Sequence, residues 1–191
     1  MSVLEVVEKF VSINGEGTKA GQLAVFIRFK GCNLNCKYCD TKWANEADAT
    51  AQQMTKEDIL EYVLSTGVKN VTLTGGEPLL RDGIEDVIEC LADNNLNVEI
   101  ETNGSIPLDN IRKLHKDNVT FTMDYKLSCS GMEAAMNLEN FDILNSNDTV
   151  KFVAGCREDL IKAKQIIEKY NLYGKCNLYI SPVFGMIEPE E

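Results

Sequence analysis

Six short apolar runs of strand-like composition alternate with stretches of helical periodicity, and this alternation limits the fold more than any other feature of the chain. The runs cover residues 23–29, 70–74, 97–102, 119–125, 149–154 and 176–181. Between the second and third runs, apolar residues repeat at the spacing of one helix face, at Ile84, Val87, Ile88 and Leu91. Alternating strands and helices indicate right-handed βαβ units and therefore a parallel sheet.

Two further helices are expected beside this one. Thr55 followed by Asp58 is typical of a helix start, with Asp in place of the usual Glu or Gln. Another apolar periodicity begins after Arg157. Six units in 191 residues suit an open sheet better than a closed eight-unit barrel, which needs about 250 residues. We therefore expect an α/β fold, an open (partial) parallel β/α barrel of about six strands, formed by residues 1–191 as a single domain.

Three cysteines follow the first run on a short loop, at Cys32, Cys36 and Cys39. A [4Fe–4S] cluster takes four thiolates, so three would leave one iron free to bind a small molecule. A structural zinc site would need four ligands, and the single histidine, His115, lies far away in a helix-like stretch. Seven cysteines, an odd number, argue against a disulfide framework. Zinc or inert thiols remain the alternatives, and no catalytic role is assigned to Cys90, Cys129, Cys156 or Cys176.

The second run ends in the segment Thr74-Gly75-Gly76-Glu77-Pro78. Ligands of parallel sheets gather at the carboxyl ends of the strands, where this segment and the cysteine loop both fall. The glycines would let the backbone approach a ligand and leave amides free to donate. Glu77 would hold an ammonium group. A plain turn between strand and helix is the alternative.

The net charge and the hydropathy of the sequence limit the substrates and the cellular locations that are expected. With 30 acidic and 19 basic residues the net charge is −11, which disfavours a nucleic-acid substrate because such binding relies on Lys and Arg. The first residues lack the pattern of a signal peptide, and no apolar stretch is long enough to span a membrane. We expect a cytoplasmic protein that acts on a small molecule.

The cysteine loop and the Gly-Gly-Glu segment together resemble the radical S-adenosylmethionine superfamily. The resemblance implies a [4Fe–4S] cluster on Cys32, Cys36 and Cys39, with S-adenosylmethionine on the open iron, where its reductive cleavage yields a 5′-deoxyadenosyl radical. The protein would supply orientation and exclusion of solvent. The cofactor contacts it implies are Tyr38, Asp40, Gly76, Glu77, Thr102, Asp124, Tyr125, Lys126 and Ser181.

Segments that flank the loop resemble the 7-carboxy-7-deazaguanine synthase family more closely. They are Phe10-Val-Ser-Ile-Asn-Gly-Glu-Gly17, Phe26-Ile-Arg28, Gly31-Cys-Asn-Leu34 and Cys39-Asp-Thr41. The family reaction is a radical ring contraction of 6-carboxy-5,6,7,8-tetrahydropterin to 7-carboxy-7-deazaguanine with loss of ammonia, on the route to queuosine. The resemblance implies Mg²⁺ bound by Thr41, an oxygen ligand that suits this ion.

The same resemblance assigns the substrate contacts and partners. Arg28 would clamp the substrate carboxylate, since a guanidinium matches it bidentately. The further substrate contacts are Ile13, Asn14, Gly15, Glu16 and Thr74, with Asn14 standing where the family usually has Gln. We expect a homodimer that receives electrons from a flavodoxin or ferredoxin. The family continues past residues 189–191, which read as the first turn of a helix, so the C-terminal end is expected to be short.

Two other functions use the same cysteine loop. An activating enzyme that installs a glycyl radical on a partner protein would have no use for a pterin carboxylate clamp. An electron-transfer module would use the cluster alone, and such a carrier normally fills all four iron sites.

Overall fold

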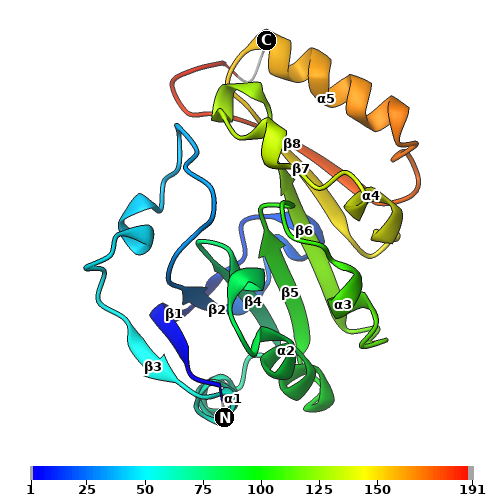
Figure 1. The fold of residues 1–191 in the computed structure, drawn as a ribbon. Coiled ribbons are helices and arrows are strands. Elements are labelled where there is room, and N and C mark those ends of the chain that lie inside the picture. The colour runs from blue at the N-terminus through cyan, green and yellow to red at the C-terminus, as the bar shows by residue number, and fades with distance from the viewer. Residues whose placement is uncertain (1, 189–191) are drawn as a thin grey trace.

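The computed structural model describes residues 2–188, and its framework is one eight-stranded sheet (Figure 1). Its strand order is β3-β1-β2-β4-β5-β6-β7-β8. The strands are β1 (Leu4–Ile13), β2 (Leu23–Phe29), β3 (Gln52–Met54), β4 (Asn70–Gly75), β5 (Asn97–Thr102), β6 (Val119–Tyr125), β7 (Thr149–Ala154) and β8 (Asn177–Pro182). Neighbours from β2 to β8 are parallel, and β3 and β8 form the two edges of the described sheet.

The six parallel strands and the open sheet confirm the predicted architecture. The two antiparallel strands, β1 and β3, were not predicted; β1 pairs with both β2 and β3. The prediction of a single domain stays a prediction, although one hydrophobic core runs from β1 to α5. The expected helical turn at residues 189–191 lies outside the described residues.

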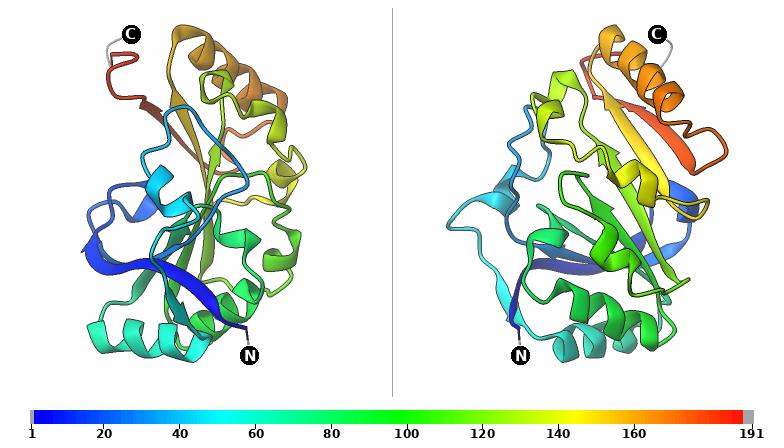
Figure 2. Two further views of the ribbon diagram at one scale, coloured as in Figure 1. Left: turned by 60° about the vertical axis from the view of Figure 1, so that its left-hand side comes forward. Right: turned by 45° about the vertical axis from the view of Figure 1, so that its right-hand side comes forward.

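Helices cover the outer side of the curved sheet (Figure 2). They are α1 (Lys56–Thr66), α2 (Ile84–Asp93), α3 (Asp109–Arg112), α4 (Asn140–Ile143) and α5 (Arg157–Lys169). The predicted start of α1 is confirmed as a reciprocal capping box: the Thr55 amide donates to Asp58 at 2.8 Å, and the Asp58 amide donates to the Thr55 hydroxyl at 3.2 Å. The expectation for His115 was wrong, because α3 ends earlier and His115 has a left-handed φ of 52°.

Alternating residues of the strands face opposite sides of the sheet, and this alternation places the site. On β2, Ile27 and Phe29 are fully buried in the core, whereas Phe26 and Arg28 face a cavity on the inner side. Likewise Phe121 belongs to the core while Thr122 faces the cavity. No helix within residues 2–188 is long and apolar enough to cross a membrane.

Candidate active site

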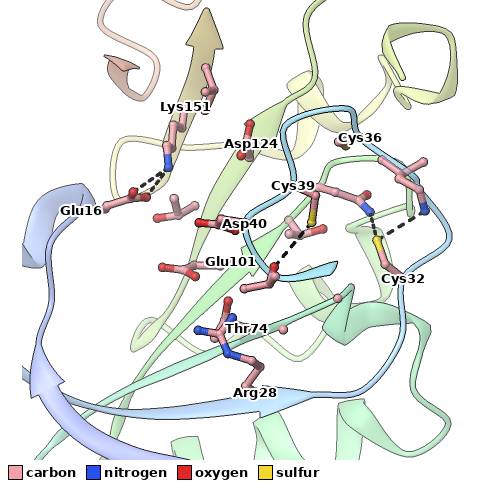
Figure 3. Close-up of a pocket in the computed structure, with 18 of the residues that line it drawn as sticks. Glu16, Arg28, Cys32, Cys36, Cys39, Asp40, Thr74, Glu101, Asp124 and Lys151 are labelled. Carbon is pink, nitrogen blue, oxygen red and sulfur yellow. Dashed lines mark hydrogen bonds and ion pairs between the residues drawn. The ribbon is translucent and has the colours of Figure 1, made fainter. Parts of the chain in front are cut away.

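A cavity of about 470 Å³ lies at the carboxyl ends of the parallel strands (Figure 3). Among the residues that line it are fifteen of the predicted site residues: Asn14, Gly15, Glu16, Arg28, Cys32, Cys36, Tyr38, Cys39, Asp40, Thr41, Thr74, Gly76, Thr102, Asp124 and Lys126. The cavity therefore gathers predicted residues that lie on or beside five neighbouring strands, from β1 to β6. Ile13, Glu77, Tyr125 and Ser181 do not line the cavity.

The cysteine loop crosses the mouth of the cavity, and Cys32 makes its most specific contacts. The Cys32 sulfur accepts hydrogen bonds from the Leu34 amide at 3.4 Å and from Asn103 Nδ2 at 3.5 Å. Donors of this kind stabilise sulfur ligands and tune iron–sulfur clusters. The three loop sulfurs do not gather within 4.8 Å of one another, as ligands of one ion would. In this arrangement the three sulfurs are not gathered as the ligands of a single zinc ion would be.

Burial affects the protonation of this loop. It raises the pKa of Cys32 and of Cys36 above the usual range of a thiol. Without metal these thiols hold their protons at neutral pH. Cluster binding must therefore release protons, because thiolates are the ligands.

The Gly-Gly segment packs against the cysteine loop, and the expectation that its amides are free was wrong for Gly76 and Glu77. The Gly76 amide donates to the Phe29 carbonyl at 3.2 Å, and the Glu77 amide donates to the Gly31 carbonyl at 3.0 Å, so neither is free. A Cβ on Gly76 would lie less than 3.0 Å from the Gly31 backbone. The glycine is required there because two backbones meet, one carrying the cysteines.

Glu77 is completely buried beneath the cavity and does not line it. Its carboxylate accepts hydrogen bonds from the Asn103 amide at 2.6 Å, the Thr102 hydroxyl at 2.9 Å and the Leu79 amide at 3.1 Å. Burial raises the pKa of Glu77 to about 7 despite these donors. The side chain thus joins the ends of β4 and β5, and the ammonium contact expected for it stays a prediction.

Arg28 lies on the floor of the cavity, opposite the cysteine loop (Figure 3). Its Nε donates to Glu8 Oε2 at 3.0 Å, and its side chain is 18% exposed. The neighbouring Thr74 hydroxyl bonds to Glu101, whose pKa burial raises to about 7. The floor therefore presents one guanidinium beside a carboxyl group that titrates near neutrality.

Asp124 and Lys126 project from the end of β6 and form a short ion pair, with Nζ and Oδ2 2.7 Å apart. Burial acts to lower the pKa of Lys126, but the charge of Asp124 outweighs it and the pKa is raised. The second carboxylate oxygen, Asp124 Oδ1, is buried in the cavity wall without a hydrogen-bond partner among the described residues. A buried acceptor of this kind suits a ligand hydroxyl, because an unpaired polar atom is costly.

Tyr38 and Thr41, two of the predicted site residues, lie on the cysteine loop and make defined contacts. The Tyr38 hydroxyl donates to the Val153 carbonyl at 3.1 Å, and burial raises the pKa of Tyr38 to about 12. Thr41 occupies the N-cap position of the 3₁₀ turn Lys42–Asn45, yet its side chain makes no capping bond. Its hydroxyl lies 3.7 Å from the Cys39 sulfur and is available to the cavity, as is the carboxylate of Asp40.

Asn14 is engaged within the protein at both ends of its side chain. Its Nδ2 donates to Glu99 Oε2 at 2.7 Å, and its Oδ1 accepts from the Glu16 amide at 3.0 Å. Glu16 in turn pairs with Lys151 of β7, with both carboxylate oxygens 2.6 Å from Nζ. The Asn14 side chain therefore supports the wall of the cavity, and any contact it makes with a ligand is not that of a free amide.

The remaining predicted residues fall outside the lining for identifiable reasons. Ile13 is 65% exposed on the last position of β1. Tyr125 stacks on Phe141 in the core, because its neighbours Asp124 and Lys126 take the other face of the chain. Ser181 lies beside Val153 on the edge strand β8.

Sequence reasoning missed Lys151, Asn103 and Glu101 as lining residues. Lys151 had a readable signal, since a lysine inside an apolar strand needs a charged partner or a polar cavity. Asn103 and Glu101 flank the predicted Thr102 at the end of β5. The sequence showed polar residues at that strand end, but it did not show which of them would contact the cavity.

Comparison with known proteins identifies this arrangement. A profile of the Radical SAM superfamily matches residues 26–125. A 7-carboxy-7-deazaguanine synthase from Clostridium acetobutylicum is 60% identical over 187 residues, covering 97% of this chain and 84% of that protein. One from Chlorobaculum tepidum is 35% identical over 189 residues, covering 97% and 83%. The crystal structure of QueE from Escherichia coli shares the fold, with a TM-score of 0.72, 23% identity and coverage of 95% and 85%.

The open parallel sheet, the three-cysteine loop and the matching profile define a radical SAM protein, a class that uses a [4Fe–4S] cluster and S-adenosylmethionine. The donors to Cys32 and the unpaired Asp124 oxygen are compatible with those two groups. Within this class, the chain belongs to the 7-carboxy-7-deazaguanine synthase family.

Proposed function

We propose that the protein is a radical SAM lyase that converts 6-carboxy-5,6,7,8-tetrahydropterin to 7-carboxy-7-deazaguanine with release of ammonia. The observation that carries the proposal is the placement of Arg28 and the cysteine loop on opposite sides of one cavity. A substrate held by its carboxylate at Arg28 would extend toward the loop. Its ring would then lie between the clamp and the cofactor.

Arg28 is suited to a carboxylate because only part of its guanidinium is in use. Glu8 takes Nε, and the two terminal nitrogens make no side-chain hydrogen bond within residues 2–188. Two parallel N–H donors match the two oxygens of a carboxylate. Glu16 and Lys151 line another part of the cavity, with their charges already paired with each other. They would limit the size of the ligand without competing for its carboxylate.

The cluster and S-adenosylmethionine, when bound, supply the radical chemistry that starts the ring contraction. Cys32, Cys36 and Cys39 would hold the cluster. We assign the sugar hydroxyls of S-adenosylmethionine to Asp124, whose Oδ1 is unpaired, and its methionyl carboxylate to Lys126. Tyr38 would cover the adenine, with its ring fixed by the bond to Val153.

We assign a Mg²⁺ ion to Thr41. Mg²⁺ prefers oxygen ligands and keeps several waters, so one hydroxyl can complete a site made mostly by substrate and water. The Thr41 hydroxyl makes no capping bond, and its contact within the protein is with the Cys39 sulfur at 3.7 Å; Thr41 and the adjacent Asp40 both line the cavity, which supports this assignment. Rate dependence on added Mg²⁺ that is lost in Thr41→Ala, but not in Thr50→Ala outside the cavity, would test it.

The expected partners and location remain part of the proposal. A homodimer would cover the apolar side chains exposed on β8 and beyond it, including Ile180 at 53% and Phe184 fully exposed. A flavodoxin or ferredoxin would approach the partly exposed cysteine loop. The partial exposure of Cys32 and Cys39 also favours a reducing compartment such as the cytoplasm.

Turnover by the reconstituted protein tests the function. Under anaerobic conditions with S-adenosylmethionine, dithionite and Mg²⁺, the carboxytetrahydropterin should yield the deazapurine and ammonia. Arg28→Ala should lower kcat/KM by about 10- to 150-fold, the loss of a charged hydrogen bond of about 1.5–3 kcal/mol. Arg157→Ala removes an exposed arginine on α5 and should change little.

The proposed function would be refuted if protein with an intact cluster gave no deazapurine product. The glycyl-radical activating enzyme is not favoured, because the relatives over nearly the whole chain are named as synthases. Such an enzyme would also be insensitive to Arg28→Ala.

A further inference from the structure

Cys129 and Cys156 form a thiol pair outside the cavity. Their sulfurs lie 2.7 Å apart, although both are free cysteines and 27 residues separate them in sequence. Cys129 lies in the 3₁₀ turn Ser128–Ser130 after β6, and Cys156 is the N-cap residue of α5 after β7. Both side chains are partly exposed, so a small reagent can reach them.

The sheet register explains why the two cysteines meet. Tyr125 of β6 is directly paired with Phe152 of β7, and each cysteine follows its member of that pair by four residues. Neighbouring strands run about 4.8 Å apart. This spacing falls within the Cα separation of about 4.4–6.8 Å that a disulfide requires. The sheet therefore brings the two turns that follow these strands together, and the cysteines lie in those turns.

Asp159 holds the two backbone segments in this arrangement. Its carboxylate is fully buried, and it accepts from the Cys129 amide at 3.2 Å and from the Gly155 amide at 2.9 Å. One side chain therefore fixes the segment on either side of the sulfurs. The pairing does not depend on the thiols alone.

A metal ion accounts less well for the same group. Cys129, Cys156 and Asp159 lie close enough together to be considered as ligands. Two thiolates on one tetrahedral zinc ion, with bonds of about 2.3 Å, would be separated by about 3.8 Å. The observed sulfurs are closer, and both Asp159 oxygens already face amide donors.

We propose that Cys129 and Cys156 form a reversible disulfide that fastens the mouth of the cavity. The oxidant would be a small-molecule disulfide. The thiolate of one cysteine attacks it and releases one thiol, and the second cysteine then displaces the other thiol. The protein loses two hydrogens and the reagent becomes two thiols, so atoms and electrons balance. This inference is independent of the reaction proposed above.

The position of the pair connects it to the cysteine loop. The amide of Lys37, between Cys36 and Cys39, donates to the Ser130 carbonyl at 3.0 Å, next to Cys129. A disulfide would tie that turn to the start of α5. The loop would then rest on a cross-linked support, and its opening would be slowed in the oxidised protein.

The test treats the cluster-loaded protein anaerobically with glutathione disulfide, alkylates the remaining thiols and maps the peptides by mass spectrometry. We expect the Cys129 and Cys156 peptides to be linked in most molecules and released by dithiothreitol. Cys90→Ser, which removes an unrelated cysteine on α2, should still form the link. Cys129→Ser and Cys156→Ser should not.

A second measurement, the Tm of the oxidised protein, shows whether the disulfide between Cys129 and Cys156 stabilises the fold. Closing this loop should raise Tm by an amount on the order of 10 °C over the reduced protein, and only when both cysteines are present. Glutathione adducts on each cysteine without a link, or a pair that resists oxidation because it retains zinc, would overturn the proposal. An unchanged Tm in the linked protein would overturn the fastening role.

Discussion

Replacing Gly76 by alanine should loosen the support of the cysteine loop, because the new Cβ would enter the backbone of Gly31. Gly76 is not in the left-handed region, so conformational strain does not contribute. The damage is a clash with backbone, which cannot rotate away as a flexible side chain could. The two backbone segments must separate, and the hydrogen bonds donated by the Gly76 and Glu77 amides stretch or break.

The size of the effect follows from these contacts. Overpacking costs about 1–3 kcal/mol, and two backbone hydrogen bonds contribute about 0.5–1.5 kcal/mol each. The free energy of unfolding should therefore fall by about 2–6 kcal/mol. Urea denaturation of the cluster-free protein measures it directly, and iron content after reconstitution should fall as well.

Gly15→Ala is the matched control. A Cβ on Gly15 meets nothing within 4 Å, and its φ is not left-handed, so alanine should be neutral or stabilise by up to about 1 kcal/mol. Suppose that the free energy of unfolding of Gly76→Ala lay within about 1 kcal/mol of the wild-type value and that the variant bound iron fully. The explanation of Gly76 by close contact with the Gly31 backbone would then be wrong.

Three further results are expected. Asn14→Ala removes the donor to the buried Glu99 and should lower the free energy of unfolding by about 1.5–3 kcal/mol in urea titrations; a loss below about 0.5 kcal/mol would contradict the contact. Burial raises the pKa of Glu77 from 4.5 to about 7, so the stability it contributes is complete below pH 4.5 and is lost as pH rises through 7. Between pH 4.5 and 8 the free energy of unfolding of the cluster-free wild type should therefore fall by about 3 kcal/mol more than that of Glu77→Gln. If the free energies of the two proteins had the same pH dependence, the raised pKa of Glu77 would be refuted. Asp124→Asn should weaken binding of S-adenosylmethionine to the cluster-loaded protein by about 10- to 150-fold in equilibrium dialysis, and an unchanged Kd would remove Asp124 from the cofactor site.

The strands and the cavity could be predicted because both depend on local pattern. Buried parallel strands are continuous apolar runs, and the carboxyl ends of such strands must share one edge. The sequence was less informative about β1 and β3. β3 has three residues, and four of the ten residues of β1 are polar or charged, so neither stands out as a buried run.

The errors within the site have a common physical origin. A motif places a residue near a strand end but does not give the direction of its side chain. Tyr125 could have been excluded, since Asp124 and Lys126 on either side of it take the opposite face. Glu77 could not, because its burial depends on donors from Thr102 and Asn103 on another strand.

The cysteine loop is anchored on both sides of the open sheet. Backbone bonds from Gly76 and Glu77 attach its beginning to β4, and the Tyr38 hydroxyl attaches its end to β7. The loop therefore connects the ends of strands β4 and β7, which are three positions apart in the sheet. A change in the conformation of this loop would therefore be transmitted to both walls of the cavity, at the ends of β4 and of β7.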